Sequence, residues 1–229
     1  MTQALDVGWD AAVPDEPRWV EVRSILLSNT GHVIGTPTGG VVVDSDGELA
    51  GLVGQPDEAT LRHARPHLVP GAELLVTRDG LAQARALLPD RHPARAILHL
   101  RADTALPPPD PRLEVVAVNE EMLATLPSQL ASEVEGAEVA VVRRVGGSAV
   151  SACGAYSLTE TLWDVGVDTL DVHRRQGHAR ACFFALVAHM AQMGMRPVWG
   201  VYEDNVASLS MARSLGFEPV DELWVMPLG

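Results

Sequence analysis

Apolar and polar positions alternate along the chain with the spacings of short helices and strands. In the first half, helical spacing of apolar positions occurs in three segments, at residues 18–28, 57–65 and 81–88. Short aliphatic runs typical of strands lie at residues 41–43, 49–53, 73–76 and 96–100. The first two runs flank the sequence DSDG, which favours a hairpin turn. This half is therefore predicted to have an α/β structure.

The second half shows a clearer pattern. Strands are expected at residues 113–118, 139–145, 149–158, 163–170, 198–202 and 217–226. Two short helices are expected after the first strand: Asn119 caps one, Pro127 breaks it, and the other ends near Glu135. Longer helices are expected at His178–Met193 and Asn205–Leu215, each closed by a glycine. The predicted order is β-α-α-β-β-β-α-β-α-β.

A proline-rich segment separates the two halves. The sequence ADTALPPPDPR, residues 102–112, cannot form a helix or a central strand, because proline lacks an amide hydrogen and restricts its neighbour. Consecutive prolines favour a stiff, extended linker. We therefore place a boundary near Pro111, between an N-terminal α/β domain at 1–111 and a C-terminal domain at 112–229. Each is long enough for a small core.

Charge and hydropathy exclude several classes of protein. The 229 residues carry 17 basic side chains, all arginine, against 30 acidic ones, which gives a formal charge of −13. An acidic chain without a basic tract is a poor binder of nucleic acid and of anionic membranes. No stretch reaches the roughly 18 apolar residues of a membrane span, and the N-terminus lacks the pattern of a signal peptide. We therefore expect a cytoplasmic protein.

Cysteine and histidine do not form a metal-binding pattern. Cys153 and Cys182 are too few for a disulfide framework and lack zinc-ligand spacing. Both lie in apolar segments, where cysteine usually acts as a small buried hydrophobe. His63 and His67 are four residues apart, but Pro66 breaks the helix between them. No metal site is expected.

The loop Arg174-Arg175-Gln176-Gly177-His178-Ala179 follows a predicted strand and opens a predicted helix. A helix start offers unpaired backbone N–H groups and a partial positive charge, which suit an anion. Gly177 allows close approach of the backbone, and Arg174, Arg175 and Arg180 add charged donors. The loop therefore predicts a phosphate or pyrophosphate site; the alternative is a surface turn with exposed arginines. The sequence matches neither the P-loop nor the dinucleotide fingerprint.

The same loop resembles the [Q/R]xxGx[G/A] motif of the GNAT superfamily of acyl-CoA N-acyltransferases, with Arg174, Gly177 and Ala179 at the defining positions. The segment NVASLSMARSLGF, residues 205–217, is similar to a second signature of that family. The matching residues there are Asn205, Ser208, Gly216 and Phe217. The resemblance covers residues 113–229 and is closest to a branch with an extra N-terminal domain.

The resemblance implies a fold, a donor and a set of cofactor-binding residues. The fold class is α/β (α+β), a mixed central sheet with splayed strands flanked by helices, plus a smaller N-terminal α/β domain. That domain is either a degenerate copy of the same fold or an unrelated cap over the acceptor site. The implied donor is acetyl-CoA or a related acyl-CoA. The residues implied to hold it are Arg174, Arg175, Gln176, Gly177, His178, Ala179 and Arg180 at the pyrophosphate, Val167, Asp168 and Thr169 along the pantetheine arm, and Asn205 and Ser208 on the second signature helix.

The implied reaction is direct attack of an amine on the thioester. Many family members have a tyrosine four residues before the signature glycine, where it acts as the general acid for the departing thiolate. In this chain that position is Ala212. Replacements must come from elsewhere, so we expect Glu203 as base, Tyr202 as acid and Asp164 as a further candidate. The remaining candidates are Glu160 and Tyr156.

The expected function is N-acetyl transfer from acetyl-CoA to a primary amine of a small molecule bound between the two halves. One alternative is a non-catalytic acyl-CoA-binding sensor or interaction module, which the missing tyrosine favours. Another is transfer to a protein N-terminus or side chain. The expected partner is a small amine rather than nucleic acid or membrane, and formation of a homodimer is left open.

Overall fold

The computed structural model describes residues 5–101, 106–108, 110 and 112–228, and these form two compact units. The first unit holds the chain up to His99, Gly200–Met211 and the segment from Pro219 onward. The second holds Leu100–Trp199 and Ala212–Glu218. The chain thus returns twice to the first unit. The expected boundary at Pro111 lies outside the described residues, and the division at 111/112 stays a prediction.

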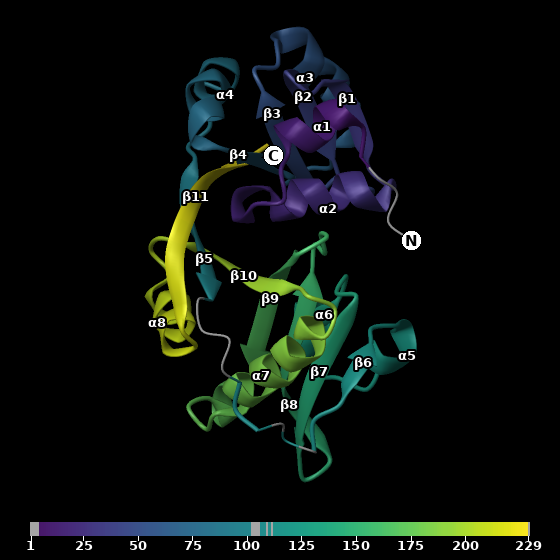
Figure 1. Cartoon of the computed structure of the whole chain (residues 1–229), viewed down its shortest axis with the longest axis vertical. Helices are drawn as coiled ribbons and strands as arrows, with labels where there is room; N and C mark the ends of the chain where they lie inside the picture. The colour runs from purple at the N-terminus through teal and green to yellow at the C-terminus, as the bar shows by residue number, and fades with distance from the viewer. Residues whose placement is uncertain (1–4, 102–105, 109, 111, 229) are drawn as a thin grey trace. The chain divides into compact units, whose positions relative to one another are not determined.

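The first unit is built from short helices and a mixed set of strands (Figure 1). Its helices are α1 (Val7–Ala12), α2 (Val20–Ser28), α3 (Glu58–Ala64) and α4 (Leu81–Leu87), with 3-10 turns at Pro17–Trp19, Arg65–His67 and Arg78–Gly80. Its strands are β1 (His32–Thr36), β2 (Gly39–Val43), β3 (Leu49–Gly54) and β4 (Glu73–Val76). Strands β1, β2 and β3 pair antiparallel in turn, β3 pairs parallel with β4, and β4 pairs antiparallel with the end of β11 (Phe217–Pro227).

The second unit is an antiparallel meander covered by helices (Figure 1). Its elements are β6 (Val115–Ala117), α5 (Glu120–Leu123), α6 (Ser128–Val134), β7 (Val139–Val145), β8 (Ser148–Tyr156), β9 (Leu162–Thr169), a 3-10 turn at Asp171–His173 and α7 (His178–Ala191). Strands β6 to β9 pair antiparallel in sequence order, and β9 then pairs parallel with β10 (Arg196–Tyr202). Strands β5 (Ala94–Arg101), β10 and β11 and helix α8 (Val206–Ser214) contain residues of both units.

Every predicted helix and strand is present, within a few residues of its expected ends. Local chemistry explains the agreement: Asn119 Oδ1 accepts a hydrogen bond from Met122 N at 2.9 Å, so α5 begins at its predicted cap. The sequence pattern does not reveal α1 and β1. Helix α1 contains no buried residue, and β1 is mostly exposed with Gly35 at φ 89°, so neither shows apolar periodicity. The predicted mixed α/β fold class is confirmed.

An aromatic cluster anchors α7 in the second unit. The ring centroids of Phe183 and Phe217 are 5.5 Å apart, and Trp199 lies 5.3 Å from Phe217 and 6.1 Å from Phe183. These three side chains are buried, and tilted or edge-to-face contacts of this kind stabilise a core beyond simple burial. The first turn of α7 is therefore held by a rigid core, which also fixes the loop that precedes it.

Candidate functional site

The loop before α7 forms an open concave turn of the backbone. Gly177 has φ 81° and Arg175 has φ 62°, so two left-handed residues flank Gln176. A left-handed arginine is unusual, and such conformations gather at binding sites. Residues 174–177 are exposed, and a Cβ atom placed on Gly177 would meet no atom within 4 Å. The turn is neither buried nor filled by other parts of the chain that the structure describes.

The amide groups of this turn lack protein acceptors. Helix α7 has Gly177 at its N-cap, and no side chain caps it. Within the described ranges, the backbone N–H groups of residues 175–180 donate to no protein oxygen. Unpaired amides at the start of a 14-residue helix, together with the helix dipole, stabilise a bound anion. The geometry is that of an oxyanion or phosphate cradle.

The three arginines of the loop lie differently from one another. Arg174 Nε donates to the Thr169 carbonyl oxygen at 3.1 Å, and Arg174 pairs with Asp171 at 3.0 Å. Arg180 Nη1 donates to the Ser214 carbonyl oxygen at 2.9 Å and stacks over Phe184. The Arg175 side chain has no hydrogen bond or ion pair within the described residues and remains free for an anion.

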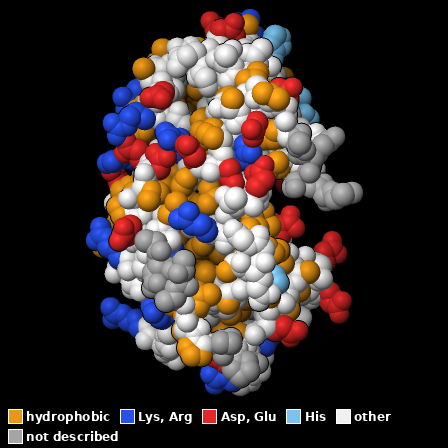
Figure 2. Space-filling model, viewed as in Figure 1, with side chains coloured by type: hydrophobic (Ala, Val, Ile, Leu, Met, Phe, Trp, Pro, Cys, Tyr) orange, Lys and Arg blue, Asp and Glu red, His pale blue; other side chains and the backbone are white. Residues whose placement is uncertain are grey.

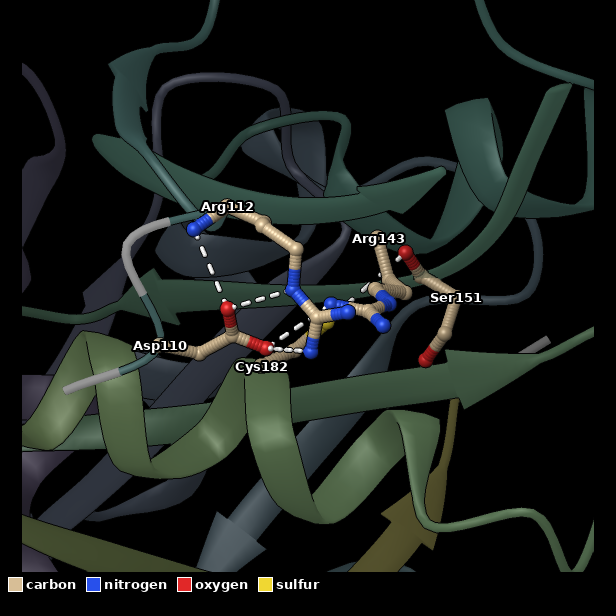
Figure 3. Close-up of polar contacts among 5 residues, drawn as sticks. All are labelled: Asp110, Arg112, Arg143, Ser151 and Cys182. Atoms are coloured by element: carbon tan, nitrogen blue, oxygen red, sulfur yellow. Dashed lines mark hydrogen bonds and ion pairs between the residues drawn. The ribbon is translucent and has the colours of Figure 1, made fainter. Parts of the chain in front are cut away.

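A small cavity adjoins the start of α7. It has a volume of about 220 Å³, and it is lined by Pro107, Pro108, Asp110, Gly177, Arg180, Ala181, Phe184 and Ala185. Its acidic member, Asp110, is neutralised. Arg112 donates to it through Nε at 2.8 Å and Nη2 at 2.7 Å, and Arg143 Nη1 donates at 2.9 Å (Figure 3). These arginines hold the pKa of Asp110 well below its usual range, so an anion next to Gly177 meets a compensated carboxylate.

Strand β9 presents one edge without a ladder partner. Its pairing with β10 comprises Arg196↔Leu162, Pro197↔Trp163 and Val198↔Asp164, and it does not continue along Val165–Thr169 in the described ladder. On its other edge, these residues pair with β8. An unpaired strand edge is a template for the amides of an extended ligand. This matches the strand splay that the resemblance implies for Val167 and Asp168.

Thr169, at the end of that strand, is already engaged by the protein. Its N–H donates to Asp168 Oδ1 at 2.7 Å, and its carbonyl oxygen accepts from Arg174. The Thr169 hydroxyl lies 2.8 Å from the Ser151 hydroxyl, which also donates to the Asp168 carbonyl oxygen. These bonds fix the strand end that leads into the cradle.

Glu133 on α6 is a candidate that the sequence pattern does not single out. A Cβ atom on Gly166, in the middle of β9, would lie 2.9 Å from Glu133 Oε1, so the carboxyl group lies directly over the strand. Tyr156 donates its hydroxyl hydrogen to the Glu133 carbonyl oxygen. Burial and the neighbouring Asp168 charge raise the pKa of Glu133. A half-buried carboxyl group with a raised pKa beside an open strand edge is suited to accept a proton.

Tyr156 and Asp164 accompany Glu133 in the second unit. Tyr156 faces Asp164 in the β8–β9 register, and burial and then the Glu133 charge raise the pKa of the tyrosine hydroxyl. A raised pKa makes this hydroxyl a weaker acid. It therefore serves better as a hydrogen-bond donor that positions α6.

The candidates Tyr202 and Glu203 lie in the first unit, whereas Glu160 lies in the second. The Tyr202 hydroxyl donates to Glu73 Oε1 at 3.3 Å, and Glu203 Oε2 accepts from Arg95 Nη1 at 3.2 Å. Burial and then Glu73 raise the pKa of the Tyr202 hydroxyl, which weakens it as an acid. Glu21, which the sequence pattern also misses, has its pKa raised to about 7 by burial and by the Glu73 charge. No sequence signal marks Glu21, because it lies within an ordinary helical pattern.

Asn205 begins the second signature helix in the first unit. Its Oδ1 accepts from Ser208 N at 3.1 Å, so Asn205 acts as the helix cap. Whether Asn205 and Ser208 also bind cofactor stays a prediction.

Arg95 belongs to an ion-pair network in the first unit. It pairs with Glu222 as well as Glu203, and Glu222 also pairs with Arg78. Arg18 and Asp221 form a neighbouring pair at 3.0 Å. The face shown in Figure 2 accordingly has acidic and basic side chains interspersed. Glu203 is therefore held by a structural network rather than standing alone.

The position of the family's tyrosine, Ala212, is fully buried in this chain. The space around position 212 accommodates the methyl side chain of alanine, and a tyrosine side chain would not fit there unless its neighbours moved. Both cysteines are buried too. The Cys182 thiol donates to the Ser151 carbonyl oxygen at 3.9 Å (Figure 3), and burial raises the pKa of this thiol to about 11. Cys182 therefore remains a neutral thiol. Across the part of the chain that the structure describes, no group of metal-ligating side chains occurs.

Comparison with known proteins gives a family match for part of the chain. Residues 135–226 match the model of the GNAT acetyltransferase family. No curated protein matches the chain. None of the described helices has the length and apolar character needed to cross a bilayer.

Several solved structures share the fold. A GNAT-family protein from Novosphingobium aromaticivorans aligns with a TM-score of 0.65 at 18% identity, covering 93% of this chain and 96% of that one. A GCN5-related N-acetyltransferase-like protein from Streptococcus suis gives a TM-score of 0.66 at 16% identity, with coverages of 94% and 95%. A tandem GNAT protein from the clavulanic acid biosynthesis pathway gives 0.55 at 14% identity and covers 96% of both chains. The chain thus resembles the GNAT acetyltransferase family in sequence over residues 135–226 and in fold over nearly its whole length.

Proposed function

We propose that this protein transfers an acetyl group from acetyl-CoA to the primary amine of a small molecule. Acyl transfer is the general activity of the GNAT acetyltransferase family, whose model matches residues 135–226. The observation that carries the proposal is the open cradle before α7, where the amides of residues 175–180 lack protein acceptors. A diphosphate supplies the oxygens that these groups need. The free Arg175 guanidinium adds a charged donor.

The β9 edge would hold the pantetheine arm of the donor. The segment Val165–Thr169 leads towards the cradle, and the edge of Val165–Val167, which has no partner in the β10 ladder, offers backbone groups to the amides of an extended ligand. The thioester would then lie near Gly166, over which the Glu133 carboxyl group is placed. Backbone N–H groups of the strand would polarise the thioester oxygen, as in other acyl transfers.

We propose Glu133 as the general base in place of the earlier candidates. The amine nitrogen attacks the thioester carbon, Glu133 takes the proton released by the amine, and the carbon–sulfur bond breaks to release the CoA thiolate. The raised pKa of Glu133 suits this step near neutral pH. Glu203, which is exposed and held by Arg95, and Tyr202, whose pKa is raised, are second choices for base and acid. Asp164 is a further candidate beside Tyr156.

Two measurements test this function. Isothermal titration calorimetry with CoA is expected to show one site per chain. Release of free thiol from acetyl-CoA is expected to depend on a small primary amine taken from a broad panel. Absence of CoA binding would reject the cradle, whereas binding without turnover across the panel would reject the enzyme.

The second candidate is an acyl-CoA-binding module without turnover. The observation that favours it is the fully buried Ala212 at the position of the usual acid. A thiolate is a good enough leaving group to depart unprotonated, so we place this candidate second. Tight CoA binding with no amine-dependent thiol release would reverse the order.

A further inference from the structure

The first unit contains a cavity that the proposed acyl transfer does not use. It has a volume of about 640 Å³ and is bordered by α3, the turn that follows α3, the end of α4 and Leu228. Small-molecule sites commonly have volumes of about 300–1,000 Å³. All of its lining residues belong to the first unit, so the cavity is complete within that unit.

The interior of this cavity is apolar. Its innermost residues, Val41, Ala64 and Leu74, are each 1% exposed and belong to the core beneath α3 and α4. Its walls are leucines and neighbouring apolar side chains, at positions Leu61, Leu68, Val69, Leu87, Leu88 and Leu228. Such a surface favours a hydrocarbon group over water, because burial of apolar area is stabilising.

Proline explains why the space is not filled by the protein. Helices α3 and α4 contain seven residues each, and Pro66 and Pro89 follow closely on their ends. Proline cannot continue a helix. Both α-helices therefore end there, and α3 is followed by the short 3-10 turn Arg65–His67, which borders the cavity.

Charged side chains lie at the rim of the cavity, in contrast to its apolar interior. Arg62, Arg65 and Arg91 line it together with Glu58 and Asp90. Arg62 is paired with Glu58 at 2.9 Å. Within the described residues, the guanidinium groups of Arg65 and Arg91 have no hydrogen bond or ion pair, and Asp90 offsets only one of these two charges. Guanidinium groups bind carboxylates through paired, charge-assisted hydrogen bonds.

We propose that this cavity binds a medium-chain carboxylate, with its hydrocarbon chain against the leucines and its carboxylate on Arg65 and Arg91. The apolar interior and the unpaired guanidinium groups together select an amphipathic anion over a neutral or cationic ligand. This site is separate from the cradle before α7 and does not depend on the acyl-transfer activity.

Calorimetry on the full chain with decanoate tests the proposal. Decanoate is expected to bind saturably at one site, at least about tenfold more tightly than decylammonium, which has the same chain, and than propionate, which has the same head group. The double variant R65Q/R91Q is expected to lose about tenfold or more in decanoate affinity. Arg85→Gln, on α4 but outside the lining, is the matched control and is expected to bind like the unaltered protein.

A second variant tests the cavity itself. Leu68→Trp fills the space without altering any rim charge, and it is expected to weaken decanoate binding while leaving CoA affinity unchanged. Undetectable decanoate binding at millimolar concentration, equal binding of decylammonium, or full decanoate affinity in both R65Q/R91Q and Leu68→Trp would overturn the proposal.

Discussion

Helix α3 in the first unit and helix α7 in the second unit both follow a strand and a loop. The two helices differ in what accepts the hydrogen bonds of their first backbone N–H groups. In the first unit, Asp57 Oδ1 accepts from the backbone N and the hydroxyl of Thr60, both at 2.8 Å. These bonds lower the pKa of Asp57. In the second unit, Gly177 stands at the cap of α7, and no side chain replaces the missing acceptor.

Under the proposed function, this difference separates a helix start that is capped by the chain itself from one that binds an anion. A carboxylate cap satisfies the amides of α3 with an anion from the chain itself, so an external anion gains nothing there. A glycine cap leaves the amides of α7 for a ligand and allows it close approach.

The buried carboxyl groups continue the comparison. Each unit contains a glutamate whose pKa is raised by burial and by a neighbouring carboxylate: Glu21 beside Glu73 in the first, and Glu133 beside Asp168 in the second. Of the two, Glu133 lies against the face of β9 at Gly166, in the segment that has no partner in the β10 ladder. We therefore propose Glu133 rather than Glu21 for proton transfer.

The largest expected effect comes from closing the open helix start. Gly177→Glu places a carboxylate where the diphosphate would bind and is expected to lower CoA affinity about a thousandfold, measured by calorimetry. Gly194→Glu is the matched control, because Gly194 follows the same helix, has φ 77° and also has open space around its Cβ position. Equal CoA affinity of the two variants would contradict the cradle.

Glu21→Gln is expected to change how stability depends on pH. The folded pKa of Glu21, about 7, lies above the ordinary value of 4.5, so its contribution to stability is complete below pH 4.5 and is lost as the pH rises through 7. The free energy of unfolding of the variant is therefore expected to increase relative to that of the unaltered protein as the pH rises, by up to about 3 kcal/mol at pH 8. Urea unfolding at pH 5 and pH 8 measures this gain, and a gain that is the same at both pH values would be inconsistent with a titrating Glu21.

Glu133→Gln is expected to lower kcat about a hundredfold while leaving CoA affinity nearly unchanged, since a base acts on the amine and not on the diphosphate. The rise of kcat/KM with pH, which follows deprotonation of Glu133, is expected to disappear in the variant. Glu203→Gln is the comparison variant, because Glu203 is the other candidate base and lies exposed directly after β10. If Glu203→Gln instead abolished the pH-dependent rise and Glu133→Gln preserved it, the base would be Glu203.

The smallest effect is expected from removing the internal cap. Asp57→Ala leaves the α3 amides unpaired and is expected to lower Tm by about 2–4 °C, as measured by thermal unfolding. Because the pKa of Asp57 is lowered by folding, its contribution is present above pH 3.8 and is lost as the pH falls. The difference in Tm between the variant and the unaltered protein is therefore expected to shrink in acid. A difference that does not depend on pH would show that Asp57 does not act through its charge.

The sequence by itself determined the helices and strands other than α1 and β1, and the open turn before α7, because these depend on neighbours along the chain. Asn119, Pro127 and the closing glycines fix helix ends locally, and alternating runs fix strands. The open start of α7 is equally local, since any helix that follows Gly177 without a capping side chain leaves its first amides unpaired.

Only the tertiary structure decided which side chains acquire unusual chemistry. Glu133 and Glu21 have raised pKa values because separate segments bury them and bring Asp168 and Glu73 close. Arg180 donates one hydrogen bond to the Ser214 carbonyl oxygen, 34 residues along the chain, and its predicted contact with phosphate stays a prediction. Burial and electrostatic contacts depend on distances in space between segments far apart in sequence, and no local pattern records those distances.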